Sequence, residues 1–329
     1  MHQRPEANRR NIKDNLAQFN NLGILVALIL LFIIFSIFAP SFFTVANIVN
    51  ILVQISMLCI CAIGMTFVIL SGGIDLSMGS ILGASGIIMA ALLQIKSISP
   101  GWITMIAIVV GILSGILLGF WNGVLVASLR FPPFIATLAM MQIHRGLIYV
   151  ITKGAAIYNF PEYFNDISRD IMGVLPVPIV IMLVVLVLSA LALKYTKVGR
   201  YTYAIGGNES ASALSGIRVT KYKIIVYVIA GFCAAIAGMI MTSRMNAAVP
   251  IAGQNYELNA IAAVVIGGAS MSGGEGRISG TFIGVLIIGI INNGMRMLMW
   301  EQGVQMAVLG AIMLIAVQMD IIRQRSLQK

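Results

Sequence analysis

Few side chains in this sequence could do acid–base, metal or nucleophilic chemistry. Asp75 follows two glycines, and Glu257 and Glu301 lie at the edges of apolar runs. The pair His144-Arg145 lies inside another apolar run. None of them forms the carboxylate pair or proton relay that such chemistry requires. The motifs GxxxxGK[ST], HExxH and GxSxG do not occur either, so the sequence predicts a protein that is not an enzyme.

The cysteines also offer no chemistry. Cys59, Cys61 and Cys233 lie inside apolar runs, with neither the spacing of metal ligands nor that of a disulfide framework. We therefore expect them to pack as small apolar side chains. No metal site is predicted, and no cofactor is predicted to bind to this chain.

The composition places the chain in a membrane. Of its 329 residues 59% are apolar and 10% are charged, whereas a soluble protein carries about 25% charged residues. One spanning helix needs roughly 20 apolar residues. We therefore predict an all-α integral membrane protein with about ten transmembrane helices, nine and eleven being the alternatives. The apolar runs fall at about 22–39, 51–70, 78–93, 103–126, 133–151, 177–193, 222–241, 258–269, 278–299 and 304–318.

The basic residues predict the orientation, because positively charged loops stay on the cytoplasmic side. With both termini in the cytoplasm, most of the 21 Lys and Arg residues lie on that side. The prediction is a cytoplasmic segment 1–21, a single transmembrane domain 22–320 and a cytoplasmic tail 321–329. Topology thus explains the net charge of +10 without a nucleic-acid partner. The outer loops receive five basic residues, Lys96, Lys153, Arg169, Arg244 and Arg296.

One basic cytoplasmic loop, at about 194–222, encodes a short helix. Asn208 is a favourable N-cap, Glu209 suits the positive end of a helix, and Gly216 suits a left-handed C-cap. So short a helix is marginal by itself and must be held by packing. It either docks another subunit or lies on the surface of its own protein.

Glycines recur with one spacing at two predicted cytoplasmic turns, each leading into a span. Glycines four residues apart allow helices to approach closely. A second alignment, of 111–123 with 280–294, would instead be an inverted repeat. The two registers disagree, so we infer close packing from them and not duplication. The two sets are Ser71-Gly72-Gly73, Gly79, Gly83 and Ser272-Gly273-Gly274, Gly280, Gly284.

At these residues the chain resembles a known family, the permease subunits of bacterial ABC importers for monosaccharides of the ribose, xylose, arabinose and galactose type. The resemblance covers the whole membrane part. It rests on GMTFVILSGGIDLSMGSILG at 64–83, FIATLAMMQIHRGL at 134–147, GRYTYAIGGNESASALSGI at 199–217 and YELNAIAAVVIGGASMSGGEGRISGTFIGVLIIGIINNG at 256–294.

The resemblance implies a bacterial plasma (inner) membrane location and several partners. These are a second permease subunit, identical or a paralogue, two ATP-binding domains that carry the ATP and Mg²⁺, an extracytoplasmic solute-binding protein, and membrane lipid. The loop would be the coupling loop that docks the ATPase. Its matching residues are Gly206, Gly207, Asn208, Glu209, Ala211, Leu214, Ser215 and Gly216.

Polar residues within or beside the spans are candidates for a pathway, since an uncharged sugar needs hydrogen-bonding groups. For each of them a hydrogen bond between helices is the alternative role. Asp75, in contrast, is expected to cap the following helix or to tie down its turn. The candidates are Thr66, Asn122, Gln142, Gln254, Tyr256, Glu257, Asn292 and Asn293.

Three alternatives to a monosaccharide permease remain open. The first is an ABC permease for another small polar solute, such as a nucleoside, a branched-chain amino acid or a signal sugar. An amino acid would favour a charged partner along the pathway, where the spans offer only Arg145. The second is a passive channel, against which the capped basic loop argues. The third, an intramembrane enzyme, lacks a paired nucleophile and base.

Overall fold

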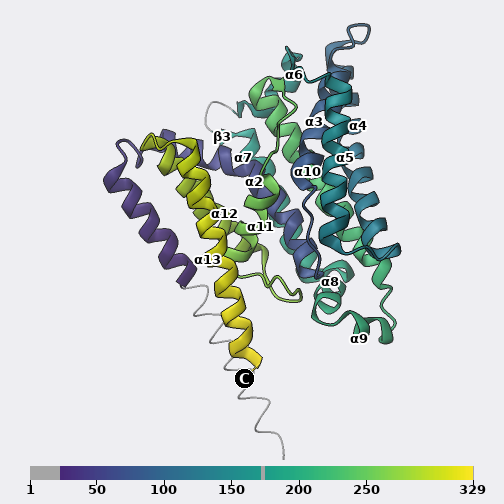
Figure 1. Ribbon diagram of the computed structural model, residues 1–329. Helices are drawn as coiled ribbons and strands as arrows, with labels where there is room; N and C mark the ends of the chain where they lie inside the picture. The colour runs from purple at the N-terminus through teal and green to yellow at the C-terminus, as the bar shows by residue number, and fades with distance from the viewer. Residues whose placement is uncertain (1–22, 172–174, 329) are drawn as a thin grey trace, which may run out of the picture.

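The computed structural model describes residues 23–171 and 175–328, and the predicted segment 1–21 lies outside them. Most of the described chain is helical (Figure 1). The described part begins with a helix at Gly23–Phe38. The further helices of the bundle are α2 Val45–Leu70, α3 Met78–Leu93, α4 Pro100–Gly123, α5 Pro133–Thr152, α7 Val177–Tyr195, α8 Lys197–Gly207, α9 Glu209–Leu214, α10 Val219–Met245, α11 Tyr256–Ile266, α12 Ile278–Met297 and α13 Gln302–Gln328.

Short elements complete the fold. A π-helical turn, Val124–Ser128, continues α4, and α6 is a single turn at Glu162–Asn165 followed by the 3₁₀ turn Asp166–Ser168. Two antiparallel strand pairs close the loops at the end of the bundle opposite α8 and α9. They are β1 Ile157–Tyr158 with β4 Ala247–Ala248, and β2 Asp170–Ile171 with β3 Leu175–Pro176.

Each of the ten predicted apolar runs contains a helix, but the helices are unequal in length. In the described part of the chain, seven are long and apolar enough to cross a membrane. The helix 23–38, α3 and α11 are shorter apolar helices. The α-helical membrane architecture is therefore confirmed at this level, while ten full spans stays a prediction.

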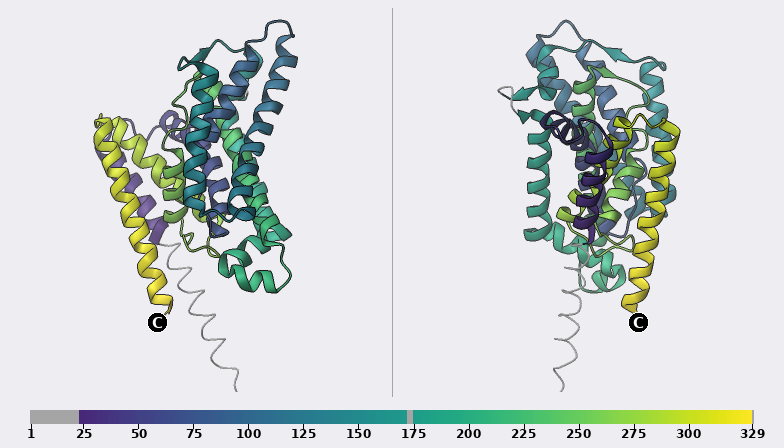
Figure 2. Two further views of the ribbon diagram at one scale, coloured as in Figure 1. Left: turned by 45° about the vertical axis from the view of Figure 1, so that its right-hand side comes forward. Right: turned by 90° about the vertical axis from the view of Figure 1, so that its left-hand side faces the viewer.

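Burial separates central from peripheral helices. Inside the molecule α2 and α10 bury 83% and 67% of their most apolar stretch, whereas α7 and α13 bury 22% and 12% of theirs. Figure 2 shows α13 and the helix 23–38 standing to one side of the bundle. A helix that is apolar all round and yet exposed in a single chain suits a lipid or a second subunit as its neighbour.

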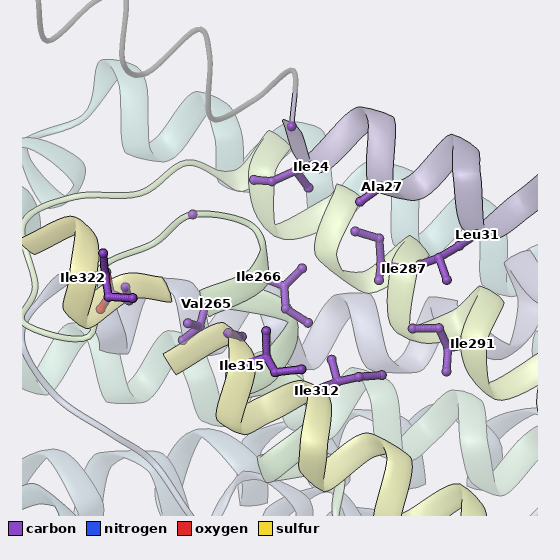
Figure 3. Close-up of a pocket in the computed structure, with 14 residues that line it drawn as sticks. Ile24, Ala27, Leu31, Val265, Ile266, Ile287, Ile291, Ile312, Ile315 and Ile322 are labelled. Carbon is purple, nitrogen blue, oxygen red and sulfur yellow. The ribbon is translucent and has the colours of Figure 1, made fainter. Parts of the chain in front are cut away.

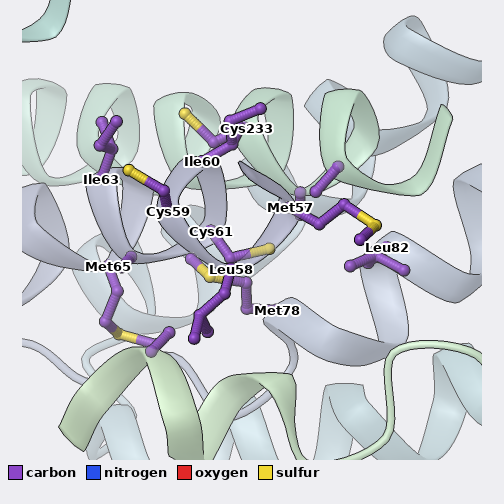
Figure 4. Close-up of a cluster of buried hydrophobic side chains, with 14 of the residues drawn as sticks. Met57, Leu58, Cys59, Ile60, Cys61, Ile63, Met65, Met78, Leu82 and Cys233 are labelled. Carbon is purple, nitrogen blue, oxygen red and sulfur yellow. The ribbon is translucent and has the colours of Figure 1, made fainter. Parts of the chain in front are cut away.

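The centre of the bundle contains the three cysteines. Cys59, Cys61 and Cys233 are at most 2% exposed. Cys59 and Cys61 of α2 and Cys233 of α10 lie among Ile, Leu and Met side chains of α2 and α3 (Figure 4). All three are free thiols. Their surroundings are those of small packing residues.

The two ends of the bundle differ. The start of the helix 23–38 and the end of α13 lie at the end that carries α8 and α9 (Figure 1). This arrangement is what both termini on one side of a membrane would require. Which side faces the cytoplasm stays a prediction.

Candidate functional site

The loop at about 194–222 contains α8 and α9, and the caps of α9 follow from its sequence. Asn208 Oδ1 accepts a hydrogen bond from the N–H of Ala211 at 2.9 Å. Gly216, at φ +83°, takes the left-handed conformation that ends the helix. The caps thus define a helix of only six residues, Glu209–Leu214.

Helix α9 is held to α10 on one side and presents an apolar side chain on its exposed side. Lys223 Nζ of α10 lies 2.5 Å from Glu209 Oε2, and Ser215 Oγ donates to the carbonyl of Ala211 at 2.9 Å. Leu214 is 92% exposed. A fixed helix with a bare leucine is suited to docking another protein.

Helix α8 rests directly on both glycine turns. Its Gly206 lies so close to the end of α2 that a Cβ there would overlap the carbonyl of Leu70. That same carbonyl accepts a hydrogen bond from the N–H of Gly274 at 2.9 Å. A Cβ on Gly273, at φ +90°, would lie 2.9 Å from both Gly206 O and Gly72 N. The ends of α2, α8 and the turn before α12 therefore form one contact of bare backbones.

A side chain of α8 adds a second link to the turn before α12. Tyr203 donates its hydroxyl to the carbonyl of Gly276 at 2.8 Å. Burial raises the pKa of Tyr203, an effect that the nearby Arg277 opposes. The hydroxyl is thus protonated at neutral pH and remains a donor.

The connection from α2 to α3 is a buried, non-helical segment, 71–77, rather than a tight turn. Side chains from neighbouring helices satisfy its backbone. Tyr227 donates to the carbonyl of Ile74 at 3.3 Å, and the N–H of Leu76 donates to Thr137 Oγ1 at 3.1 Å. Buried non-helical backbone requires such partners.

Asp75 is placed to fix this segment. Its carboxylate accepts hydrogen bonds from the Ser77 N–H at 2.9 Å and from the Ser77 hydroxyl at 2.7 Å. The amide of Asn122 donates to Ser77 Oγ at 2.6 Å and approaches Asp75 at 3.4 Å. Asp75 and Asn122 are both fully buried. Their contacts are those of an anchor inside the protein.

The two short helices α3 and α11 meet at their N-terminal ends. A Cβ on Gly79, in the first turn of α3, would overlap both Glu257 Oε2 and the carbonyl of Gly253. Similarly, a Cβ on Gly83 would lie 2.8 Å from the carbonyl of Ala252. Short helices whose N-termini meet inside the bundle are a recurring device of solute sites in transporters. The positive helix ends favour the Glu257 carboxylate.

The glycines before and within α12 have a similar role. A Cβ on Gly280 would overlap the carbonyl of Gly267, and one on Gly284 would overlap that of Ala263. Helix α12 therefore packs on α11 through bare backbone.

Two polar cavities flank the segment that leads into α11. The first, which we call the arginine chamber, has a volume of about 600 Å³ and lies between α2, α11 and α12. Arg296 donates to Gln54 there. Its polar lining is Gln54, Arg244, Gln254, Asn255, Tyr256, Asn259, Asn292, Arg296 and Gln302.

The second cavity, which we call the α5 chamber, has a volume of about 520 Å³ and lies between α5 and residues 250–258. Gln254 and Asn255 line both chambers and so lie between them. The lining of the α5 chamber is otherwise Leu76, Leu138, Met141, Gln142, Arg145, Tyr149, Pro250, Ile251, Glu257 and Leu258.

A third cavity, of about 580 Å³, is apolar. It lies between the helix 23–38, α11, α12 and α13 and is lined mainly by Ile, Leu and Val side chains (Figure 3). Such a lining offers little to a hydrophilic solute.

The structure divides the eight predicted pathway residues. Gln142, Gln254, Tyr256, Glu257 and Asn292 line one or both polar chambers. The other three bond to other helices: Asn122 as described, Thr66 with Thr281 Oγ1 at 2.8 Å and Asn293 with Asn47 at 3.1 Å.

Sequence reasoning misplaced two arginines. Arg244 and Arg296 were assigned to outer loops, but they lie in the last turns of α10 and α12 and line the arginine chamber. Arg145 is thus not the only arginine beside the polar cavities. A long basic side chain at the end of an apolar helix can lie along that helix. The position of each arginine at the end of an apolar run was therefore the signal that could have placed it beside a cavity.

Comparison with known proteins gives a single family. Residues 47–317 match the family described as branched-chain amino acid transport system / permease component. The chain is 46% identical to the ribose import permease protein RbsC of Bacillus subtilis (strain 168), over 91% of this chain and 92% of that one. It is 44% identical to RbsC of Escherichia coli (strain K12), over 90% and 92%.

Relatives with other substrates in their names are similar over the same length. The L-arabinose transport system permease protein AraH of Escherichia coli (strain K12) is 39% identical over 94% of this chain and 92% of its own. No solved structure matches the chain. The match over most of the chain and the apolar helices lead to one conclusion: the chain belongs to this family of transport-system permease components and is a multi-pass inner-membrane protein.

Proposed function

We propose that this chain forms the transmembrane pathway of an ATP-driven importer that moves a monosaccharide, most closely ribose, into the cytoplasm. The observation that carries the proposal is the 44–46% identity to ribose import permeases over about nine tenths of both chains. Permeases named for D-allose and L-arabinose are less similar, at 38% and 39%.

The chain would act with partners that supply energy and solute. These are a second permease subunit, identical or paralogous, two ATP-binding domains that hold ATP and Mg²⁺, and an extracytoplasmic binding protein. The chain itself contributes no catalytic group. The capped helix α9 with its exposed Leu214 supports ATPase docking. The exposed apolar helices α7 and α13 support pairing with a second permease subunit within a membrane.

The contacts of α8 suggest how docking reaches the pathway. A push on α9 moves α8, which touches the end of α2 and the turn before α12 through Gly206. The end of α2 continues through segment 71–77 into α3, and the first turn of α3 lies against Glu257 at the start of α11. The turn before α12 follows the other end of α11. The coupling loop and the polar chambers are therefore joined by rigid, closely packed pieces, as a two-state switch requires.

An amino-acid permease is the second candidate, because the matching family is named for branched-chain amino acids. The charged groups Arg145 and Glu257 in one chamber could face the two charges of an amino acid. The closer identity to sugar permeases favours the monosaccharide.

The test is uptake by the assembled importer. The chain is co-expressed with its ATPase and binding protein, and radiolabelled ribose uptake is followed with an intact ATPase and with one lacking its Walker lysine. Uptake that disappears with the lysine supports the proposal. ATP-dependent uptake of leucine but not ribose would contradict the sugar, and flux that survives the mutation would indicate a channel.

A further inference from the structure

We propose that the α5 chamber is a solute site inside the membrane that selects neutral, hydroxyl-rich molecules. In it Glu257 accepts and Arg145 and Gln142 donate hydrogen bonds to hydroxyl groups. The inference rests on the proposed function and deepens it, because it assigns recognition to named residues of this chain. The volume of the α5 chamber, about 520 Å³, lies within the range of about 300–1,000 Å³ that is typical of small-molecule sites.

The first argument is an unused acceptor. Glu257 is 7% exposed, and its Oε2 has no hydrogen-bond partner among the described residues. A buried polar atom without a partner is costly and calls for an explanation. The N-terminal ends of α3 and α11 stabilise the carboxylate. Oε2 lies against the backbone of α3 at Gly79, so a solute hydroxyl in the chamber would supply the missing donor by replacing part of that contact.

The second argument is that Arg145 is already engaged. Its Nη1 donates to the carbonyl of Ala252 at 2.6 Å and to that of Pro250 at 3.2 Å. The guanidinium is thereby fixed against the segment before α11. Its Nη1 is occupied, so it cannot contribute to a bidentate contact with a carboxylate. Its remaining N–H groups suit single hydrogen bonds to hydroxyls.

The third argument is charge balance. Arg145 and Glu257 give the α5 chamber one positive and one negative group, and no direct ion pair joins them in the described chain. The neighbouring arginine chamber has Arg244 and Arg296 and no acidic lining residue. A neutral solute therefore fits the α5 chamber without leaving an uncompensated charge. Tyr149 adds an aromatic ring for the apolar face of a sugar.

The experiment uses the full complex of permease, ATPase and binding protein in proteoliposomes. Glu257→Gln keeps the shape of the side chain and removes its charge; Glu301→Gln makes the same change at an exposed site and is the control. We expect Glu257→Gln to raise the KM for ribose uptake at least ~10-fold, as for a lost hydrogen bond to a charged acceptor. It should also make the sugar acid ribonate a better inhibitor, because Arg145 is then uncompensated. A merely structural role would not produce that inhibition.

A second measurement reads the chamber without transport. Gln142→Cys is labelled with a water-soluble maleimide in the assembled complex, where the native cysteines are buried. Ribose should slow the labelling, and leucine and ribonate should not. Unchanged KM and inhibition in Glu257→Gln, or ribose uptake without protection of position 142, would overturn the chamber while leaving the importer intact. Protection by leucine alone would assign the chamber to an amino acid, and loss of ribose uptake in the unmodified complex would overturn the proposed function.

Discussion

At the scale of single residues, exposure separates the docking candidate from the buried anchors. Leu214 is 92% exposed on a helix that is capped at both ends. Asp75, by contrast, is fully buried and holds the chain in place through Ser77. A change at the first should alter an interaction with a partner, whereas a change at the second should alter the fold.

The prediction at this scale is that Leu214→Lys uncouples the permease from its ATPase. Because the side chain is bare, thermal stability should change by no more than about 0.5 kcal/mol, while ATPase co-purification and ribose uptake should fall at least ~10-fold, as for a central interface residue. The control is Met299→Lys, since Met299 is apolar and 91% exposed. It lies in the turn between α12 and α13, at the other end of the bundle from α9 (Figure 1). Equal co-purification of the two variants would remove the docking role of α9.

At the scale of elements, local signals could be predicted and long-range contacts could not. The caps of α9 depend on Asn208 and Gly216, which lie within nine residues of each other, so the sequence was sufficient to predict them. Thr66 bonds to a residue 215 positions away. Its role between helices was open until the helices were placed. The same holds for Arg296, whose direction depends on α2 and Gln54.

The second prediction tests the contact between α8 and the two glycine turns. A Cβ on Gly206 would overlap backbone, whereas one on Gly207 meets nothing within 4 Å. Gly206→Ala should therefore cost about 1–3 kcal/mol of stability, as overpacking does, and should lower ATP-driven uptake. Gly207→Ala should leave the stability nearly unchanged. The readouts are thermal unfolding of the purified complex and uptake per ATP hydrolysed. Full activity in Gly206→Ala would show that α8 need not touch these turns.

At the scale of the whole molecule, apolar runs predicted which segments are helices but not how deeply each crosses. Composition cannot distinguish a full span from a short helix that stops inside the bundle, because both are apolar. Helix α3 begins there because buried partners such as Thr137 and Tyr227 hold the non-helical backbone before it. Those partners become visible only when distant helices are packed.

The third prediction concerns the orientation of the bundle in the membrane. Ser210 in α9 and Tyr163 in α6 lie at opposite ends of the bundle, and both are exposed (Figure 1). If the basic loop is cytoplasmic, Ser210→Cys should react with an impermeant maleimide only in inverted vesicles, and Tyr163→Cys only in intact spheroplasts. The unmodified chain is the control, because its three cysteines are buried. The reverse pattern would place α9 outside the cell, where no ATPase could reach it, and would overturn both the topology and the coupling role.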